Sequence, residues 1–413
     1  MPVSETKPMD VWRTRLPGQP LSHRRVLMIS PVNMMRAYSS FQYLADALSE
    51  LDATVDVLAA IPREIMNEAR QVFGKSLLSY RAGWQSRVPK GWRFLYRRNI
   101  KRLLTKRPNC ILLYCTSPTS LTPEIINYKT KNPQTKLVLF CPEIWLPDEP
   151  VNIPDSKLVY FQQNIRLADL VIDVDATRAE LRRKHFSIDH AIPVLPNTAP
   201  KSSLPDLAQP GKLRRLAGLP SDCQQKLLLF TGPARKKTIN ELMRIVQSVS
   251  PNVTLVWFVH GDEVVAQKTQ AEFDSSIQAG RVKVIRSVPR VELLSFSYQA
   301  DAGLIVYPFR EIQTTNQKFA SPSKLYEFLA RGLPVVSYPN PSIQTILNKY
   351  DVGVCSKLES PESLAQAINS LFDRDDLPQY SERCEHTFNS HLCHEVAATD
   401  ALVTLVKLIS AEQ

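Results

Sequence analysis

The chain has 413 residues, of which 44% are hydrophobic and 22% are charged, and its formal net charge is +11. This composition is typical of a folded protein and excludes a disordered one, and the length predicts two domains with a core each. No apolar run is long enough to span a bilayer, and residues 1–22 read as a loose polar leader without the pattern of a signal peptide. The seven cysteines include no Cys-x-x-Cys pair, so we expect reduced, mostly buried thiols and a cytoplasmic protein.

Short apolar strands alternate with helices in residues 23–200. A helix is predicted over Tyr38–Leu51, and strands are predicted at Arg25–Ser30, Val55–Ala60, Cys110–Cys115, Lys136–Phe140, Leu170–Val174 and Ala191–Leu195. Continuous apolar strands that alternate with helices indicate a parallel sheet covered on both faces. We therefore expect an α/β domain with a doubly wound sheet.

The same alternation restarts after residues 201–225, which are rich in Pro, Lys and Ser and read as a linker. Further strands are predicted at Lys226–Thr231, Leu255–His260, Val282–Ile285, Ala302–Val306, Leu333–Tyr338 and Gly353–Cys355. A second doubly wound domain over residues 226–385 follows from this pattern. Residues 386–413 are predicted to form C-terminal helices, which could cross back to the N-terminal domain.

The segment from Phe319 to Tyr338 is the most informative part of the chain. It reads as a turn, a helix with Ser323 as its N-cap, and a buried strand. A helix N-terminus attracts anions, and Lys324 adds a full positive charge there. Glu327, one turn later, could accept hydrogen bonds from two hydroxyls. A phosphate site beside a diol-binding carboxylate suits a nucleoside diphosphate, although an ordinary amphipathic helix followed by a core strand is the simpler alternative.

The run SPSKLYEFLARGLPVV, which begins at Ser321, resembles the donor-binding motif of GT-B glycosyltransferases, especially family 4, the glycosyl transferases group 1. The resemblance implies two Rossmann-like domains facing across a cleft, with residues 23–200 on the acceptor side and residues 226–385 on the donor side. It also implies that Glu327 holds the ribose and that Ser323, Lys324 and Leu325 belong to the donor site. Many members carry a Glu-x7-Glu pair, but the earlier position is Phe319 here.

Other segments of the second half resemble the same family, including Val288–Ser295 and Ala300–Pro308, which resemble the helix and strand that end in a loop at the cleft. LFTGPARKK, from Leu229 to Lys237, resembles the strand and basic loop that meet the donor diphosphate, which implies donor contacts from Gly232, Arg235, Lys236 and Lys237. Gly232 would let the backbone approach the ligand closely. VWFVHGD, from Val256 to Asp262, resembles the strand and glycine turn that line the base pocket, and it brings His260 and Gly261 into the predicted site. The likeness covers roughly residues 160–375 well.

The first half departs from the family pattern, because no glycine follows the first strand. Asn33 and Arg36 could replace the missing backbone contacts with side chains, or this could be a structural loop. After the fourth strand, Glu143 and Asp148 offer carboxylates at the carboxyl edge of the sheet, where an acceptor hydroxyl would need a general base. A solvated surface loop is the alternative interpretation.

A basic segment, residues 70–107, supplies the charge imbalance of the chain. It holds 12 Lys and Arg residues and no acidic one, and the other 39 basic residues nearly match the 40 acidic ones. Within it, apolar residues fall at helical spacing, and the candidates for surface contact are Trp84, Trp92, Phe94, Arg97, Arg98 and Lys101. Leu95 is predicted to lie on the apolar face of this helix, together with Tyr96, Ile100, Leu103 and Leu104. Docking on an anionic membrane, a solvated helix face and a nucleic-acid footprint all fit this pattern, and no nucleic-acid motif accompanies it.

Two apparent metal motifs have simpler interpretations. Asp173-Val-Asp175 resembles the Asp-x-Asp motif of the other large glycosyltransferase fold, but its place between a strand and a helix favours Asp175 as an N-cap. The Cys and His residues between Cys384 and His394 lack the spacing of a standard zinc site. We expect no metal and no cofactor.

The resemblance implies transfer of a sugar from a nucleoside diphosphate-sugar to a hydroxyl acceptor, which we expect to be lipid-linked or membrane-associated, with peripheral attachment to the inner face of the membrane. Retention of the anomeric configuration is favoured; an inverting enzyme would use Glu143 or Asp148 as the base. The alternatives are a catalytically silent membrane- or nucleic-acid-binding scaffold and a sugar-nucleotide epimerase, although the Ser-Gly-Gly stretch and paired glutamates expected of an epimerase are missing. Base, sugar, acceptor and oligomeric state cannot be inferred from the sequence.

Overall fold

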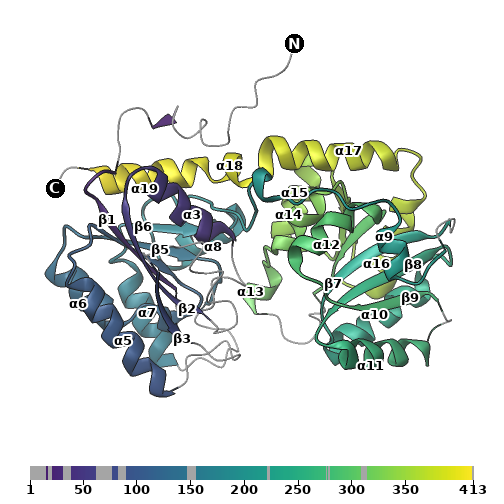
Figure 1. The fold of residues 1–413 in the computed structure, drawn as a ribbon, viewed down its shortest axis with the longest axis horizontal. Coiled ribbons are helices and arrows are strands. Elements are labelled where there is room, and N and C mark those ends of the chain that lie inside the picture. Colours follow the sequence, from purple (N-terminus) through teal and green to yellow (C-terminus); the bar gives the residue numbers. More distant parts are fainter. Residues whose placement is uncertain are drawn as a thin grey trace, which may run out of the picture. The chain divides into compact units, whose positions relative to one another are not determined.

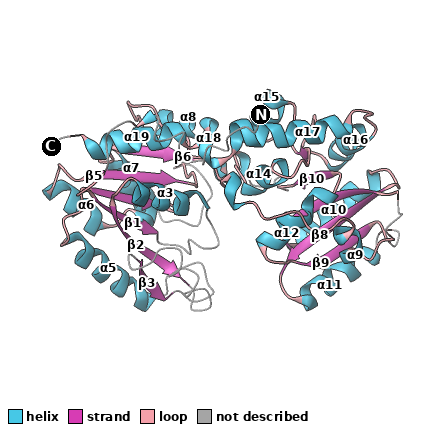
Figure 2. Ribbon diagram, turned by 45° about the horizontal axis from the view of Figure 1, so that its top comes forward, coloured by secondary structure: helices cyan, strands magenta, loops and turns pink. Residues whose placement is uncertain are grey.

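The chain forms two compact units in a computed structural model, shown in Figure 1. The first unit contains residues 1–197, 314–316 and 394–413, and the second contains residues 198–313 and 317–393. The structure describes residues 15–16, 21–30, 39–61, 77–81, 90–146, 155–220, 224–275, 277, 280–307 and 314–411. Each unit is built on one six-stranded parallel sheet with helices on both faces (Figure 2).

The first unit has the strand order β3-β2-β1-β4-β5-β6. Its strands are β1 Arg25–Ser30, β2 Thr54–Ile61, β3 Leu77–Arg81, β4 Cys110–Tyr114, β5 Lys136–Cys141 and β6 Leu170–Asp173. Its longer helices are α3 Ser39–Glu50, α5 Lys90–Leu104, α6 Pro123–Lys131, α7 Asp155–Ile165, α8 Ala176–His185 and α19 Thr399–Ser410, with the short α18 His394–Ala397 before the last. One face of the sheet packs against α3 and α19, and the other packs against α5, α6, α7 and α8. The strands are buried on both faces, as a parallel sheet requires.

The second unit repeats this architecture with the order β12-β11-β10-β7-β8-β9. Its strands are β7 Lys226–Pro233, β8 Val253–His260, β9 Val282–Arg286, β10 Ala302–Ile305, β11 Val335–Ser337 and β12 Gly353–Cys355. On one face lie α10 Lys236–Ser248, α11 Glu263–Asp274 and α16 Pro361–Phe372. On the other lie α9 Lys212–Leu216, α12 Arg290–Phe296, α14 Ser323–Leu329 and α15 Pro341–Tyr350. The helix α17, Leu377–Thr387, contributes to both cores. The short α13, Thr315–Lys318, begins in the residues grouped with the first unit and ends in the second.

The predicted α/β class with two Rossmann-like parallel-sheet domains is confirmed. The expected strand at Ala191–Leu195 is wrong, because only Val194 forms a bridge, to Asp173. Pro193 and Pro196 flank that bridge and have no N–H to extend a ladder. The strand β3 lies within the basic segment and was not predicted. Residues 201–225, expected to be a linker, contain α9.

Most of the described cysteines are buried, as expected. Cys355 is partly buried, and the fully buried free thiols among the described residues are Cys110, Cys115, Cys141, Cys384 and Cys393.

Candidate functional site

Lys324 lies at the carboxyl edge of the second sheet. Its Nζ donates a hydrogen bond to the backbone oxygen of Thr231, at 2.8 Å, near the end of β7. The same nitrogen lies 5.3 Å from the ring centroid of Phe230 and 5.9 Å from that of Tyr307, in the range of cation–π attraction. Burial lowers the pKa of Lys324 to about 8, and the charge of Glu327 acts in the opposite direction. An anion bound here would therefore stabilise the protonated form strongly.

Glu327 lies one turn after Lys324 on α14 and has a partner that the sequence did not predict. Its Oε1 accepts a hydrogen bond from Nε of Arg290, at 2.7 Å. The Glu327 side chain is 17% exposed and that of Arg290 is 47% exposed. Arg290 is the first residue of α12; the sequence around it resembles a helix of the family, but that resemblance did not predict a contact with the 321–336 motif.

The position of α14 depends on a glycine in the adjacent strand. A Cβ on Gly303 of β10 would lie 2.3 Å from Cδ2 of Phe328, so only glycine allows this ring to pack against the strand. Leu325 and Leu329 complete the buried face of α14. Close packing of helix against strand thus fixes where Lys324 and Glu327 emerge.

The start of α14 corrects one prediction. The N-cap position is held by Pro322, without a side-chain cap, and Ser323 is already the first helical residue. Pro322 has extended backbone angles (φ −77°, ψ 141°), so the turn ends one residue earlier than expected. The seven-residue helix is short, and we therefore assign the attraction for an anion to Lys324 instead of the helix terminus. The side chain of Leu325 is in the core, and its N–H donates to the backbone oxygen of Pro322.

The other predicted diphosphate contacts follow β7 directly. Arg235 occupies the N-cap position of α10, and Lys236 and Lys237 are its first residues. All three are exposed, and Nζ of Lys236 lies 3.0 Å from Oε2 of Glu272. A Cβ on Gly232 would contact only the ring of Phe230, at 3.5 Å, but the residue is buried and its oxygen accepts a hydrogen bond from Nε1 of Trp257 at 3.1 Å.

His260 and Gly261 lie at the end of the neighbouring strand β8 and are exposed. Gly261 has φ +147°, and a Cβ there would lie 2.8 Å from Cβ of Val265. Only glycine fits this turn into α11, whose N-cap is Asp262. Because β7 and β8 are adjacent and parallel, the two predicted base-pocket residues and the basic residues of α10 share one edge of the sheet.

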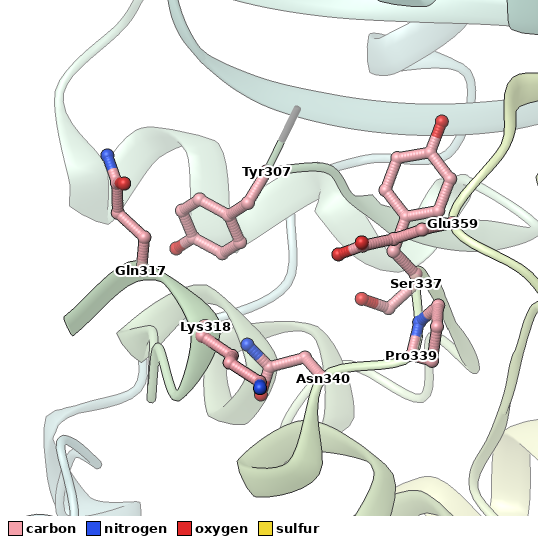
Figure 3. Close-up of a pocket in the computed structure, with 8 residues that line it drawn as sticks. Tyr307, Gln317, Lys318, Ser337, Pro339, Asn340 and Glu359 are labelled. Atoms are coloured by element: carbon pink, nitrogen blue, oxygen red, sulfur yellow. The ribbon is translucent and has the colours of Figure 1, made fainter. Parts of the chain in front are cut away.

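A small polar pocket lies at the ends of β10 and β11 (Figure 3). Its lining is Tyr307, Gln317, Lys318, Ser337, Tyr338, Pro339, Asn340 and Glu359. The Tyr307 ring that faces Lys324 also forms a wall of this pocket, so the pocket and the lysine are neighbours. Figure 3 shows the Glu359 carboxylate pointing toward Tyr307. The sequence did not predict this pocket, since its residues come from segments 52 positions apart.

In the first unit, Glu143 follows β5 beside a buried cluster of charges. Burial raises the pKa of Glu143, while the charge of Arg178 and a hydrogen bond with Asn316 oppose that rise. Arg178 donates from Nη2 to the oxygen of Pro142 at 2.7 Å and to Oδ1 of Asn316 at 3.0 Å. A carboxylate with a raised pKa is suited to accept a proton from a hydroxyl.

The Asp-x-Asp segment has the structural role that the sequence favoured. Asp175 is the N-cap of α8, and its Oδ1 accepts from the N–H of Arg178 at 2.9 Å, which confirms that prediction. Asp173 is fully buried and pairs with Nε of Arg182 at 2.7 Å.

Residues 225–374 match the family model of Glycosyl transferases group 1. The second unit contains a group 1 glycosyl transferase domain, and the chain has the GT-B fold. The match lies within the second unit and covers less than half of the chain. No curated protein sequence matches the chain.

Solved structures with the same fold cover nearly the whole chain. A glycosyltransferase from Rickettsia africae has 13% identity and a TM-score of 0.67, with 95% of this chain and 100% of that one covered. Anabaena Alr3699/HepE in complex with UDP and glucose has 13% identity and a TM-score of 0.66, with 93% and 99% covered. A putative UDP-N-acetylglucosamine 2-epimerase from Listeria monocytogenes has 12% identity and a TM-score of 0.59, with 93% and 95% covered. Because these structures share only 12–13% sequence identity with the chain, the similarity establishes the fold alone.

The basic segment of this GT-B chain includes the amphipathic helix α5. Its buried face consists of Tyr96, Ile100, Leu103 and Leu104. Leu95, predicted with that face, is instead 41% exposed and lies beside Phe94, which is 70% exposed. Nη2 of Arg97 pairs with Oε1 of Glu124 at 2.5 Å, and Arg98 and Lys101 are exposed.

Several predicted residues lie outside the described part of the chain. These are Asn33, Arg36, Trp84 and Asp148, together with the side chain of Trp92. Among the described helices, none is long and apolar enough to cross a membrane.

Proposed function

We propose that this protein transfers a sugar from a nucleoside diphosphate-sugar to a hydroxyl acceptor, with Lys324 and Glu327 as the centre of its donor site. The observation that carries the proposal is the partly buried Lys324 at the end of β7, held between two aromatic rings and one turn from a carboxylate. Negative charge grows on the diphosphate as the glycosidic bond breaks, and a cation already in place stabilises it without reorganisation.

The basic start of α10 extends this positive charge along the same edge. Arg235, Lys236 and Lys237 follow β7 directly, so a diphosphate bound at the end of β7 would lie near the basic start of α10 as well as near Lys324 of α14. These cations take the role that a divalent metal has in other transferases. A UDP-linked sugar is the first donor to test, because Anabaena HepE, of the same fold, is seen in complex with UDP and glucose and with UDP-glucose.

The proposed reaction retains the anomeric configuration, with a donor phosphate oxygen taking the proton of the acceptor hydroxyl. If the product is inverted instead, Glu143 is the base, because its raised pKa suits it to hold that proton.

Thermal unfolding with UDP, GDP, ADP, dTDP and CDP tests the donor site. A nucleotide at about 100 times its dissociation constant should add roughly 2.7 kcal/mol of stability. Lys324→Ala and Glu327→Ala should weaken this stabilisation, whereas Lys349→Ala, which removes an exposed cation from α15 of the same unit, should not. If none of the five nucleotides stabilises the wild-type protein, the proposal fails and a catalytically silent scaffold gains weight.

The second part of the proposal is that α5 docks on an anionic bilayer, so that the acceptor is lipid-linked or held at a membrane. Tyr96, Ile100, Leu103 and Leu104 fix the helix to the sheet, and this orientation leaves Phe94 and Leu95 exposed near Arg98 and Lys101. Exposed apolar side chains among cations are typical of an interfacial helix. Each cation near an anionic surface contributes about 1 kcal/mol of attraction.

Vesicle sedimentation tests this docking. Binding to phosphatidylglycerol vesicles should exceed binding to phosphatidylcholine vesicles and should fall with salt. Arg98→Glu with Lys101→Glu should abolish it, and Phe94→Ser with Leu95→Ser should weaken it at low salt. Lys131→Glu, at the exposed end of α6, is the matched control. Equal binding by the control and the α5 variants would count against this surface.

A further inference from the structure

The contact between Arg290 and Glu327 joins two elements of the second unit. Arg290 begins α12, which follows β9, while Glu327 lies on α14, which packs against β10. Both helices cover the same face of the sheet, with Leu293 and Phe296 of α12 in the cluster that holds Leu325 and Phe328. The helices therefore bring a guanidinium and a carboxylate together from positions 37 residues apart.

The contact uses only one oxygen of the carboxylate. Nε of Arg290 donates to Oε1 of Glu327 at 2.7 Å. Within the described parts of the chain, Oε2 of Glu327 accepts no hydrogen bond. Because the Arg290 side chain is 47% exposed, such a pair adds little to the stability of the fold. Its effect is to fix the orientation of the carboxylate.

We propose that Arg290 is a positioning residue that holds Oε1 of Glu327 so that Oε2 faces the two ribose hydroxyls of the donor. This inference rests on the proposed function, since it assigns the partner of the carboxylate in the same site. A charge-assisted hydrogen bond is short and directional, so it selects one side-chain orientation in advance of binding. A carboxylate that is already oriented loses less side-chain entropy when the diol binds, so the binding free energy is more favourable.

Arg290 also prevents an ion pair between Glu327 and Lys324, which contact different parts of the donor. The two lie three positions apart on α14, and the charge of Glu327 already acts on the pKa of Lys324. Without Arg290, the carboxylate would be free to pair with the ammonium on the same helix, because i,i+3 pairs of opposite charge attract one another. A Glu327–Lys324 pair would withdraw the carboxylate from the ribose and the cation from the diphosphate. Arg290 therefore preserves both contacts.

Calorimetric titration with UDP and with 2′-deoxy-UDP tests this role. The wild-type protein should prefer UDP by roughly tenfold or more, because the analogue lacks a hydroxyl that donates to a charged acceptor. Arg290→Ala should reduce UDP affinity roughly tenfold while changing affinity for the deoxy analogue much less, so that the preference collapses. Arg290→Lys should restore part of the preference, and Arg286→Ala, an exposed arginine at the end of β9, should leave it unchanged.

The possible results separate this inference from the function on which it rests. Equal losses for UDP and its deoxy analogue in Arg290→Ala would mean a general structural or phosphate contact, and would overturn the positioning role while leaving the donor site intact. An unchanged preference would overturn it as well. A wild-type protein that binds neither ligand, nor any other nucleoside diphosphate, would overturn the proposed function itself and the role of Arg290 with it.

Discussion

At the scale of single residues, Lys324 should make nucleotide binding sensitive to pH. Burial lowers its pKa to about 8 from an ordinary value of 10.5, so the ligand-free protein loses this charge as the pH rises through 8. A bound diphosphate restores the charge, and binding above that pH must therefore take up a proton. We expect UDP affinity to be constant below about pH 7 and to fall as the pH rises above 8, measured by calorimetry between about pH 6 and 9.5.

Lys324→Arg is the matched variant for this prediction, because a guanidinium stays protonated over the whole range. Its UDP affinity should be lower but nearly independent of pH. The ligand-free wild-type protein should itself become more stable as the pH rises from 8 toward 10.5, since the unfolded chain then binds the proton that the folded protein has released. The same loss of affinity with pH in both variants would exclude Lys324 as the titrating group.

Arg182 and Arg183 are adjacent on α8 and provide a second comparison. Arg182 is buried and pairs with the fully buried Asp173, whereas Arg183 pairs with Glu180 at the surface. Arg182→Met leaves a carboxylate buried with less compensation, so we expect it to lower the free energy of unfolding by about 3–5 kcal/mol. Arg183→Met should leave the urea midpoint almost unchanged. Equal effects on the two midpoints would contradict the assigned role of the Asp173–Arg182 pair.

At the scale of elements, the contact between Gly303 and Phe328 determines where α14 lies. A methyl group on Gly303 cannot fit 2.3 Å from the Phe328 ring, so Gly303→Ala must push α14 away from β10. We expect a loss of about 1–3 kcal/mol in unfolding free energy, measured with urea, and a larger proportional loss of UDP affinity. Adding Phe328→Leu should recover part of both. A double variant no better than Gly303→Ala would show that the clash is relieved elsewhere.

The sequence predicted elements better than it predicted contacts between them. Most strands were predicted correctly because each one is a run of consecutive apolar residues. The helix α14 was predicted because its motif is contiguous in the sequence. The expected strand at Ala191–Leu195 failed because its apolar character suited burial while its prolines prevented a ladder. The cap of α14 was misplaced by one residue, since a serine after a proline and a serine before a helix look alike in sequence.

Arg290 and the polar pocket were missed for a different reason. An ion pair between residues 37 positions apart depends on the packing of α12 and α14 on one sheet face, and nothing near Arg290 in the sequence encodes its partner. The pocket joins the ends of β10 and β11 to α13 and Glu359 in the same way. A local motif can therefore identify Glu327, but only the tertiary structure identifies what holds it.

At the scale of the whole molecule, the C-terminal helix α19 packs in the hydrophobic core of the N-terminal unit. Residues 394–413 group with the first unit, and Leu402, Leu405 and Ile409 of α19 lie in one cluster with Phe41 and other residues of α3. The sequence shows that α19 is amphipathic, but an apolar stripe alone does not specify which sheet it covers. The core on one face of the first sheet is therefore complete only when α19 packs against it.

Leu405→Ala should accordingly destabilise the N-terminal unit from the opposite end of the chain. Leu405 is fully buried in α19, and truncation of such a leucine costs about 2–5 kcal/mol. Hydrogen exchange should accelerate in β1 and β4, while β7 and β8 keep their protection in the presence of UDP. Lys407→Ala, exposed on the same helix, should leave both patterns unchanged. Faster exchange in β7 and β8 but not in β1 would mean that α19 stabilises the donor unit instead, because each sheet reports only on the core to which it belongs.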